Sequence, residues 1–178
     1  MRIRVISGTF GGRVIDAPQG FTTHPMSERM RNALFNKLGN LEGKTVLDPF
    51  AGSGAISLEA ISRGAEHVTA IEKDRIAQKV IAKNMATLGV KGQMKLIAAF
   101  AATWSNNNPD VQFDVIICDP PYNDLQLSTI GKLTRHLKKD GLMVLSHPGR
   151  EPAPTVNGVV VVDTKRYGNA ALAIYHKA

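Results

Sequence analysis

The chain has 178 residues, of which 43% are hydrophobic and 21% are charged. These values are typical of a globular domain and exclude a disordered chain, and the length favours a single domain with its own core. No apolar run of about 18 residues is present, and the N-terminus lacks the apolar segment of a signal peptide. We therefore expect a cytoplasmic protein that does not cross a membrane.

Charge, cysteine and histidine content indicate which partners, disulfides and metal sites to expect. The formal net charge is +7, and residues 1–44 carry seven basic side chains against three acidic ones. A positive chain favours a polyanionic partner, although many basic proteins do not bind nucleic acid. Cys118 is the single cysteine, which excludes an internal disulfide, and its apolar surroundings indicate a core residue. The five histidines are far apart in sequence, so we expect no metal site.

The N-terminal residues predict a β-hairpin. Residues 2–7 and 13–17 carry β-branched side chains, and the segment between them is rich in glycine. Arg2 and Arg4 share one face because side chains alternate along a strand. Together with Arg13 they could contact phosphate groups. An equally good explanation is an edge strand whose charges prevent it from pairing with strands of other molecules.

A polar loop separates this hairpin from a predicted helix. Ser27 is a suitable N-cap for a helix over residues 28–38, in which Met30, Leu34 and Leu38 form one apolar stripe. The stripe predicts that this helix packs on the core through one face.

From residue 45 onward the pattern changes to strand, glycine turn and helix. Residues 45–47 predict a strand, 48–54 form the turn, and 55–63 predict a helix. A glycine-rich turn ahead of a helix lets a ligand approach the backbone, and the free helix N–H groups favour a negative group. Neither the phosphate-loop signature nor GxGxxG is present. The pattern alone therefore leaves open whether this segment binds a small molecule or is a tight turn without a ligand.

Glu72 ends the next predicted strand, residues 67–72, and lies 18 positions after Gly54. In dinucleotide-binding sheets an acid at such a place bonds a ribose diol, because a carboxylate accepts from two hydroxyl groups at once. The alternative is that Glu72 is a solvated acid, or one that caps the helix that follows. Asp74 suits the N-cap of that helix, which is predicted to extend to about residue 88.

An apolar segment, residues 100–104, follows a predicted strand at 93–98. It either lines a pocket or packs against the sheet, and for Trp104 we expect packing. Residues 105–110 are polar and predict a surface loop.

The tetrapeptide Asp119-Pro120-Pro121-Tyr122 directly follows the apolar run 113–118, which predicts a buried strand. Ligands of open α/β sheets bind at the carboxyl ends of strands, and consecutive prolines hold the nearby carbonyls rigidly. Asp119 and the Pro120 carbonyl suit the two N–H groups of an exocyclic amine, with the Tyr122 ring stacked on the base. A proline-rich turn without such a role is the alternative.

The remaining residues complete a predicted α/β fold. They predict a helix over 125–137, a strand over 141–147, and an antiparallel pair over 159–164 and 170–175. The alternation of strands and helices predicts a Rossmann-like, mostly parallel sheet that ends in an antiparallel strand.

The glycine turn, Glu72 and the tetrapeptide together resemble the class I S-adenosyl-L-methionine-dependent amino-group methyltransferases. Residues 7–13, 26–36 and 58–65 look like the RsmD family, which methylates the N2 amino group of guanine in small-subunit ribosomal RNA. The resemblance covers nearly the whole chain in family order. It implies a hairpin extension at 1–26 and a methyltransferase domain at 27–178.

The resemblance also implies roles for individual residues. The target amine would be held by the residues Asp119, Pro120, Pro121 and Tyr122. S-adenosyl-L-methionine would be bound by Asp48, Phe50, Ala51, Gly52, Ser53, Gly54, Glu72, Lys73, Phe100 and Asp119. The arginines expected to contact RNA are Arg2, Arg4, Arg13, Arg29 and Arg31. The implied partner is ribosomal RNA or an assembling small subunit, and the expected protein is a monomer without a metal.

This chain departs from the family pattern at two places, and both bear on the affinity of binding and on the choice of the target nucleotide. His24-Pro25-Met26 stand where Arg-Pro-Thr is usual, and Ala98-Ala99-Phe100 stand where an acidic or amide residue often follows the third strand. Adenine recognition would then depend on backbone groups and on the Phe100 ring.

Three other functions compete with this interpretation. A DNA methyltransferase acting on adenine N6 or cytosine N4 uses a similar tetrapeptide, but the chain is short and offers no added recognition domain. A non-catalytic RNA-binding assembly factor would not need the intact Asp119 and glycine turn. The glycine spacing disfavours a nicotinamide dehydrogenase.

Overall fold

The computed structural model describes residues 2–19 and 25–178, so His24 lies outside the described residues. A seven-stranded sheet with the order β5-β4-β3-β6-β7-β9-β8 forms the centre, and β1 and β2 form a separate antiparallel hairpin. The strands are β1 (Arg2–Arg4), β2 (Val14–Asp16), β3 (Thr45–Asp48), β4 (His67–Glu72), β5 (Met94–Ala98), β6 (Phe113–Cys118), β7 (Leu137–Pro148), β8 (Val159–Tyr167) and β9 (Ala170–Lys177). The helices are α1 (Glu28–Leu38), α2 (Ala55–Ser62), α3 (Arg75–Leu88), α4 (Ala101–Asn107), α5 (Leu127–Leu133) and the 3₁₀ turn η1 (Thr134–His136).

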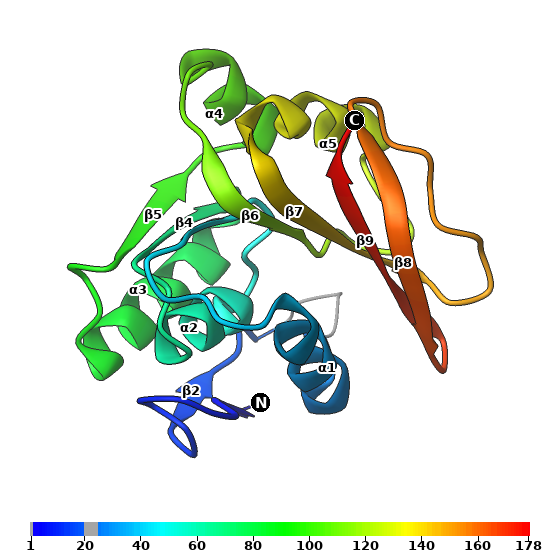
Figure 1. Ribbon diagram of the computed structural model, residues 1–178. Coiled ribbons are helices and arrows are strands. Elements are labelled where there is room, and N and C mark those ends of the chain that lie inside the picture. The colour runs from blue at the N-terminus through cyan, green and yellow to red at the C-terminus, as the bar shows by residue number, and fades with distance from the viewer. Residues whose placement is uncertain (1, 20–24) are drawn as a thin grey trace.

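Strand direction confirms the predicted sheet. Strands β3 to β7 pair in parallel, whereas β9 runs antiparallel to both β7 and β8. Helices α1, α2 and α3 cover one face of the sheet, and α4 and α5 cover the other (Figure 1). Each face has its own apolar core, one around Leu34, Leu58 and Ile81 and the other around Trp104, Phe113 and Ile130. The fold is therefore the three-layer α/β arrangement that the sequence indicates.

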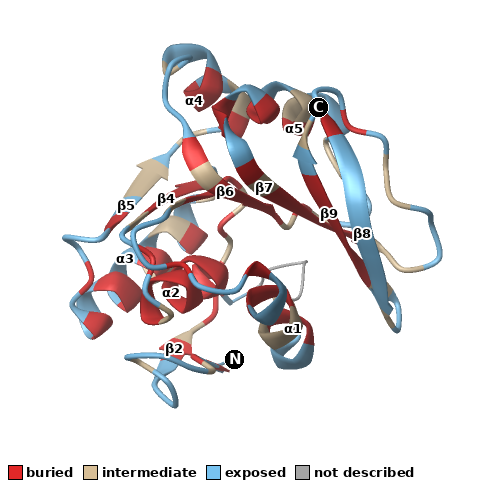
Figure 2. Ribbon diagram, in the orientation of Figure 1, coloured by how far each residue is buried: buried red, intermediate tan, exposed pale blue. Residues whose placement is uncertain are grey.

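Helix α2 is the most deeply buried helix, with all eight of its residues buried (Figure 2). It lies between the sheet and the N-terminal segment, and it begins directly after the glycine turn. A helix buried on every side must satisfy its polar side chains internally. The Ser57 hydroxyl donates to Asp48, the Ser62 hydroxyl donates to the Ser7 carbonyl, and Glu59 accepts from the backbone N–H groups of Ile6 and Ser7.

Helix ends agree with the predictions where side chains cap them. Ser27 Oγ accepts from the N–H of Met30 at 3.1 Å, and Asp74 Oδ2 accepts from the N–H of Ala77 at 2.9 Å. Gly89 closes α3 in the left-handed conformation. These caps fix the observed ends because each satisfies a backbone group that the helix leaves unpaired.

Two elements on the other face differ from prediction. The segment predicted as a polar loop, residues 105–110, contains the last three residues of α4, because the Ser105 hydroxyl bonds His136 Nε2 at 2.7 Å and Trp104 packs against the Phe113 ring at 6.1 Å. Packing here outweighs the weak helix propensity of serine and asparagine. Helix α5 is shorter than predicted, since Gln126 has φ 53° and Leu137 already pairs with Phe113 in the sheet.

Cys118 and Trp104 lie in the core, as predicted. Burial raises the pKa of the Cys118 thiol, which agrees with a structural residue rather than a nucleophile. No helix in ranges 2–19 and 25–178 has both the length and the apolar character needed to cross a membrane.

Candidate active site

Three acidic residues lie at the ends of three adjacent parallel strands. Asp48 ends β3, Glu72 ends β4, and Asp119 follows β6. Strand β3 lies between the other two, so the three carboxylates meet at one edge of the sheet. The carboxyl edge is where ligands of open parallel sheets bind.

The glycine turn after β3 is held against β4. Gly52 has φ 57° and Gly54 has φ 82°, conformations that glycine adopts without steric cost. The N–H of Ala51 donates to the Ile71 carbonyl at 3.0 Å, and the N–H of Gly52 donates to Glu72 Oε1 at 2.8 Å. This turn is a rigid backbone surface ahead of the first N–H groups of α2.

Asp48 is fully buried and only half satisfied. Its Oδ2 accepts from the Ser57 hydroxyl at 2.7 Å, whereas Oδ1 has no hydrogen-bond partner within the described residues. Burial raises the pKa of Asp48 to about 7, and the charges of Asp119 and Glu72 add to the effect. A buried acceptor without a donor normally has a ligand or water as its partner. Asp48 therefore suits a cationic donor such as an ammonium group.

Glu72 combines a structural bond with spare acceptor capacity on each oxygen. Oε1 accepts from the N–H of Gly52, and Oε2 accepts from the N–H of Asp74 at 2.7 Å. Each carboxylate oxygen has two lone pairs, so each can accept one more donor. The two backbone bonds hold the carboxylate in a fixed orientation in which a pair of vicinal hydroxyls can bind.

Phe100 and Lys73 form the outer side of this edge. Lys73 follows Glu72, and its Nζ lies 5.4 Å from the centre of the Phe100 ring, a cation–π distance. Phe100 is 62% exposed. An exposed aromatic ring beside Glu72 provides an apolar surface for a flat heterocycle.

The tetrapeptide after β6 is fixed by β7. The Tyr122 hydroxyl hydrogen-bonds the Ser146 hydroxyl, and the Pro121 carbonyl accepts from the N–H of Asp124 at 3.0 Å. Burial raises the pKa of Asp119 to about 6, and a bond from Ser146 opposes the shift. Asp119 is thus an acceptor that ionises near neutral pH. Ser146 was missed by the sequence analysis, because a serine inside the apolar strand β7 carries no local signal.

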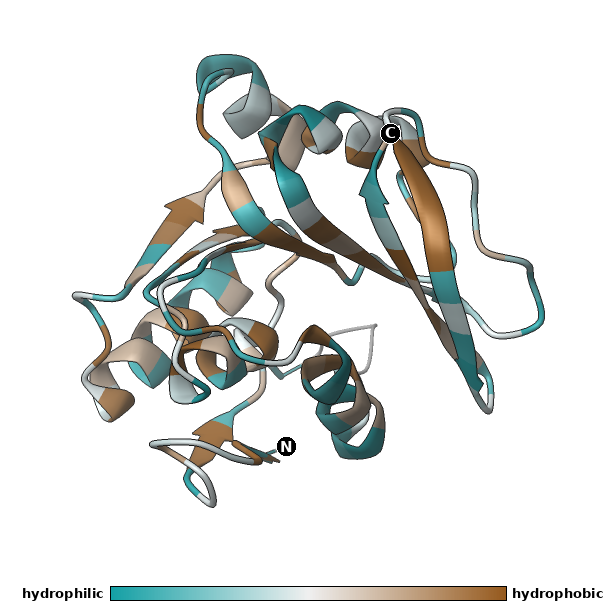
Figure 3. Cartoon of the chain, in the orientation of Figure 1, coloured by the Kyte–Doolittle hydropathy of each residue, from teal (hydrophilic) through white to brown (hydrophobic). Residues whose placement is uncertain are grey.

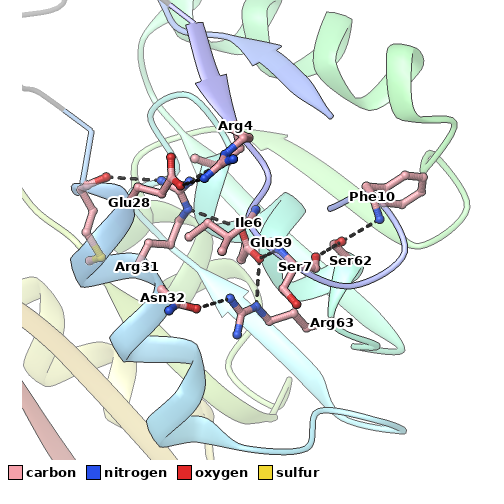
Figure 4. Close-up of polar contacts among 12 residues, drawn as sticks. Arg4, Ile6, Ser7, Phe10, Glu28, Arg31, Asn32, Glu59, Ser62 and Arg63 are labelled. Atoms are coloured by element: carbon pink, nitrogen blue, oxygen red, sulfur yellow. Dashed lines mark hydrogen bonds and ion pairs between the residues drawn. The ribbon is translucent and has the colours of Figure 1, made fainter. Parts of the chain in front are cut away.

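Arg31 is not a surface residue, and its predicted contact with RNA is wrong. The side chain is 2% exposed, and its Nε lies 3.5 Å from Glu59 Oε1 while Nη2 donates to the Arg4 carbonyl at 2.6 Å (Figure 4). Burial lowers the pKa of Arg31, and the charge of Glu59 opposes this shift. Its position on α1, next to Met30, turns it toward α2.

Glu59 connects the N-terminal hairpin to helix α2. Oε1 accepts from the N–H of Ile6 at 2.8 Å, and Oε2 accepts from the N–H of Ser7 at 3.1 Å and from Arg63 Nε at 2.9 Å (Figure 4). Three donors and the positive charge of Arg31 therefore surround this carboxylate. The hairpin is consequently docked on the helix that begins at the glycine turn.

The other predicted RNA-contact arginines lie near the surface and already have partners in three of four cases. Arg4 forms an ion pair with Glu28, Arg13 donates to the Thr87 carbonyl at 3.4 Å, and Arg29 lies against the Tyr167 ring. Arg2 is exposed on β1. A role for these four arginines in binding RNA stays a prediction.

Two further features lie apart from the strand-end acids. A cavity of about 410 Å³, lined by Lys44, Asp114 and Lys138 among others, lies at the beginnings of β3 and β6, at the opposite edge of the sheet. Within 2–19 and 25–178, no group of three or more His, Cys, Asp or Glu side chains could hold a metal ion.

Comparisons with known proteins agree with this geometry. The family model "Conserved hypothetical protein 95" matches residues 3–176. A proposed rRNA methyltransferase, YlbH of Bacillus subtilis, is 32% identical over 98% of this chain and 99% of its own length. Ribosomal RNA small subunit methyltransferase D of Escherichia coli is 35% identical over 68% of this chain and 61% of its own length. The solved structure of the proposed methyltransferase yhhF of Escherichia coli has a TM-score of 0.88 at 31% identity, covering 99% of this chain and 98% of that one.

Proposed function

Because the chain belongs to the RsmD family of ribosomal RNA small-subunit methyltransferases, we propose that it transfers a methyl group from S-adenosyl-L-methionine to the exocyclic N2 amine of a guanine in small-subunit ribosomal RNA. The observation that carries this proposal is the meeting of Asp48, Glu72 and Asp119 at one sheet edge. Each acid has an environment suited to a different part of the reaction.

The residues present fit S-adenosyl-L-methionine. The unpaired Oδ1 of Asp48 and the backbone of the glycine turn, residues 51–54, would hold the methionine portion, whose ammonium group is a donor. The remaining lone pairs of Glu72 would accept from the ribose hydroxyls, and the Phe100 ring would contact the adenine. Phe50 and Lys73 would form the remaining sides of the cofactor site.

The cofactor, when bound, supplies an electrophilic methyl group on a positively charged sulfur. Asp119 and the Pro120 carbonyl would each accept one N–H of the target amine, which orients the nitrogen lone pair toward the cofactor. A guanine amine is a weak nucleophile, and a nearby carboxylate stabilises the positive charge that develops on nitrogen. Since the pKa of Asp119 is about 6, it can also accept the proton that the nitrogen must release.

The aromatic ring of Tyr122 would stack on the target base. Its hydroxyl is tied to Ser146 on β7, so the ring orientation is set before the base arrives. A preorganised stacking surface lowers the entropic cost of binding a base that has left its helix.

The proposal is tested by identifying the modified base. The protein is incubated with isotope-labelled S-adenosyl-L-methionine and small subunits, or their naked RNA, from cells that lack it, and the RNA is digested and analysed by mass spectrometry. We expect label in N2-methylguanosine at one position. Label in an N6-methyladenine or N4-methylcytosine of DNA offered in parallel would contradict the proposal. Saturable cofactor binding without label in any nucleic acid would favour a non-catalytic assembly factor.

A further inference from the structure

The turn between β8 and β9 lies at the same edge of the sheet as the strand-end acids. Strand β7 runs parallel to β6, so Ser146 and Pro148 approach the Asp119 side. Strand β9 runs antiparallel to β7 and begins there, with Pro148 opposite Ala170. The N–H of Gly149 donates to the Asn169 carbonyl at 2.8 Å, which ties the end of β7 to this turn. Substrate bound at Asp119 therefore has the β8–β9 turn as a neighbour.

Helix α1 lies alongside β8 in the opposite direction. Lys37, near its C-terminal end, pairs with Asp163 at 2.7 Å, whereas Arg29, near its N-terminal end, lies 5.9 Å from the centre of the Tyr167 ring. The N-terminal end of α1 thus meets the end of β8 at the carboxyl edge. This contact brings cations from two distant parts of the sequence together.

Tyr167 is the centre of this group. Its ring is half-buried against the core, and Lys165 Nζ lies 5.7 Å from its centre in addition to Arg29. Cation–π contacts hold both cations near one ring. Arg166 bends over the turn, where its Nε donates to the Gly168 carbonyl at 2.8 Å. We call Arg29, Lys165, Arg166 and Tyr167 the β8–β9 patch.

The patch concentrates like charge without a matching acid. Across residues 2–19 and 25–178, no carboxylate lies within 4.0 Å of the charged groups of Arg29, Lys165 or Arg166. The nearest acid along the same strand face, Asp163, is already paired with Lys37. Two cations at one ring, Arg29 and Lys165, and a third on the adjoining turn, Arg166, repel one another unless an anion binds them.

Strand β8 has a different character at its two ends. Its first half carries exposed valines, and it becomes hydrophilic toward the β8–β9 turn (Figure 3). Val160, Val161 and Val162 are 45%, 47% and 51% exposed, but they lie at the end remote from Asp119. The charged half is the one that adjoins the site.

We propose that the β8–β9 patch binds the phosphate backbone of the RNA strand next to the target nucleotide. This inference rests on the proposed function, because it assumes an RNA target at Asp119. Arginine and lysine are the usual phosphate partners, and backbone contacts fix the register of a strand without reading its sequence. The patch would thereby set which nucleotide of a bound strand reaches the Tyr122 ring.

The N-terminal hairpin is less well suited to this task. Arg4 on β1 is paired with Glu28, so its positive charge is already partly neutralised. Arg2 lies beside Asp16, which itself pairs with Lys83 at 2.9 Å. The patch therefore offers more unpaired positive charge at the site than the hairpin does.

A matched pair of triple variants tests the proposal. One replaces Arg29, Lys165 and Arg166 by glutamine, and the control replaces the exposed residues Lys79, Lys91 and Lys95, which belong to α3, β5 and their connection. Binding of a fluorescein-labelled single-stranded RNA of about 16 nucleotides is followed by anisotropy from low to high KCl. Calorimetric binding of S-adenosylhomocysteine shows that each variant is folded. Methyl transfer to unmodified small-subunit RNA is measured in parallel.

For the patch variant we expect the slope of log K against log [KCl] to become shallower by about 2, since each lost phosphate contact contributes about 0.7. We expect RNA affinity at low salt to fall at least ~10-fold, with unchanged cofactor binding, and the control to change less than ~3-fold. Equal losses in the two variants, or a patch variant with wild-type slope, would overturn the proposal. If wild-type protein transfers no methyl group, but RNA binding falls in the patch variant as expected and not in the control, the result would contradict the proposed function while supporting the patch.

Discussion

Two buried carboxylates, Glu59 on helix α2 and Asp48 at the end of β3, have opposite surroundings. Glu59 and Asp48 are both fully buried. Glu59 accepts from the backbone of Ile6 and Ser7 and contacts two arginines, so both of its oxygens are satisfied. Asp48 accepts a single hydroxyl bond, and its other oxygen has no donor from the part of the chain that the structure describes.

The difference separates a structural acid from a functional one. A buried charge surrounded by donors holds elements together, and its removal leaves those donors unsatisfied. A buried charge with an unpaired oxygen lowers stability and is retained where a ligand completes it. Glu59 therefore holds the hairpin on α2, whereas Asp48 has an oxygen free to bind the cofactor. Substitutions at these sites test the structural role of Glu59 and the binding role of Asp48 separately.

The largest expected effect on stability is that of Glu59→Ala. The substitution removes the only acidic partner within 4.0 Å that the described residues give the buried Arg31 guanidinium, and it leaves the N–H groups of Ile6 and Ser7 without an acceptor, which should cost about 3–5 kcal/mol of unfolding free energy. Urea unfolding measures this loss. The exposed Glu66→Ala should change it by less than ~0.5 kcal/mol. A loss for Glu59→Ala no larger than that of Glu66→Ala would show that the hairpin does not depend on this carboxylate.

A paired glycine experiment tests the same docking through the backbone. Gly8 and Gly12 both have positive φ, but a Cβ at Gly8 would lie 1.8 Å from the Ser62 carbonyl oxygen, whereas a Cβ at Gly12 would meet nothing within 4 Å. Gly8→Ala should therefore cost about 2–4 kcal/mol and Gly12→Ala about 1 kcal/mol in thermal unfolding. Similar costs at both positions would mean that the hairpin moves away from α2 without penalty.

Asp48→Asn should change how stability depends on pH. The pKa of Asp48 is raised to about 7 in the fold, so the fold binds a proton that the unfolded chain has already released, and stability falls as pH rises through this value. Between pH 5 and pH 8 the wild-type chain should lose about 2–3 kcal/mol more than the variant. Denaturant unfolding at both pH values measures the difference, with the exposed Asp110→Asn as control. The variant should also bind S-adenosylhomocysteine at least ~10-fold more weakly.

The pH profile of methyl transfer should reflect Asp119. Burial raises the pKa of Asp119 to about 6, and a protonated carboxyl group cannot accept both the N–H and the proton of the amine. With saturating cofactor, kcat/KM for RNA should therefore fall as pH decreases below about 6, approaching tenfold per pH unit. Constant kcat/KM down to pH 5 would exclude an ionised Asp119 as the acceptor.

Local sequence patterns correctly predicted the features that depend only on neighbouring residues, such as helix caps and the glycine turn. Ser27 and Asp74 cap their helices through their own side chains, and the glycine turn and the strand-end acids follow from strand–turn–helix spacing. Parallel strand order then brought the acids to one edge, as expected. These features require only neighbours in sequence and a general rule of α/β folds.

Contacts between distant segments were not predictable in the same way. Arg31 resembles any surface arginine on α1, and only the meeting of α1 with α2 buries it beside Glu59. Ser146 gains its role because β7 pairs with β6 and brings it to Tyr122. Helix α4 forms because Trp104 and Ser105 find partners on β6 and η1. Arg31, Ser146 and Ser105 each depend on a partner more than 20 positions away.

The central claim is that the strand-end acids divide the work, with Asp119 serving the target amine and not the cofactor's binding. Asp119→Ala, compared with wild type in one experiment, tests it through transfer of labelled methyl groups to unmodified small-subunit RNA, with calorimetric binding of S-adenosylhomocysteine as the reference. We predict that the variant binds the cofactor product within ~3-fold of wild type and loses methyl transfer by at least ~100-fold. Retained methyl transfer in a variant that still binds would contradict the account.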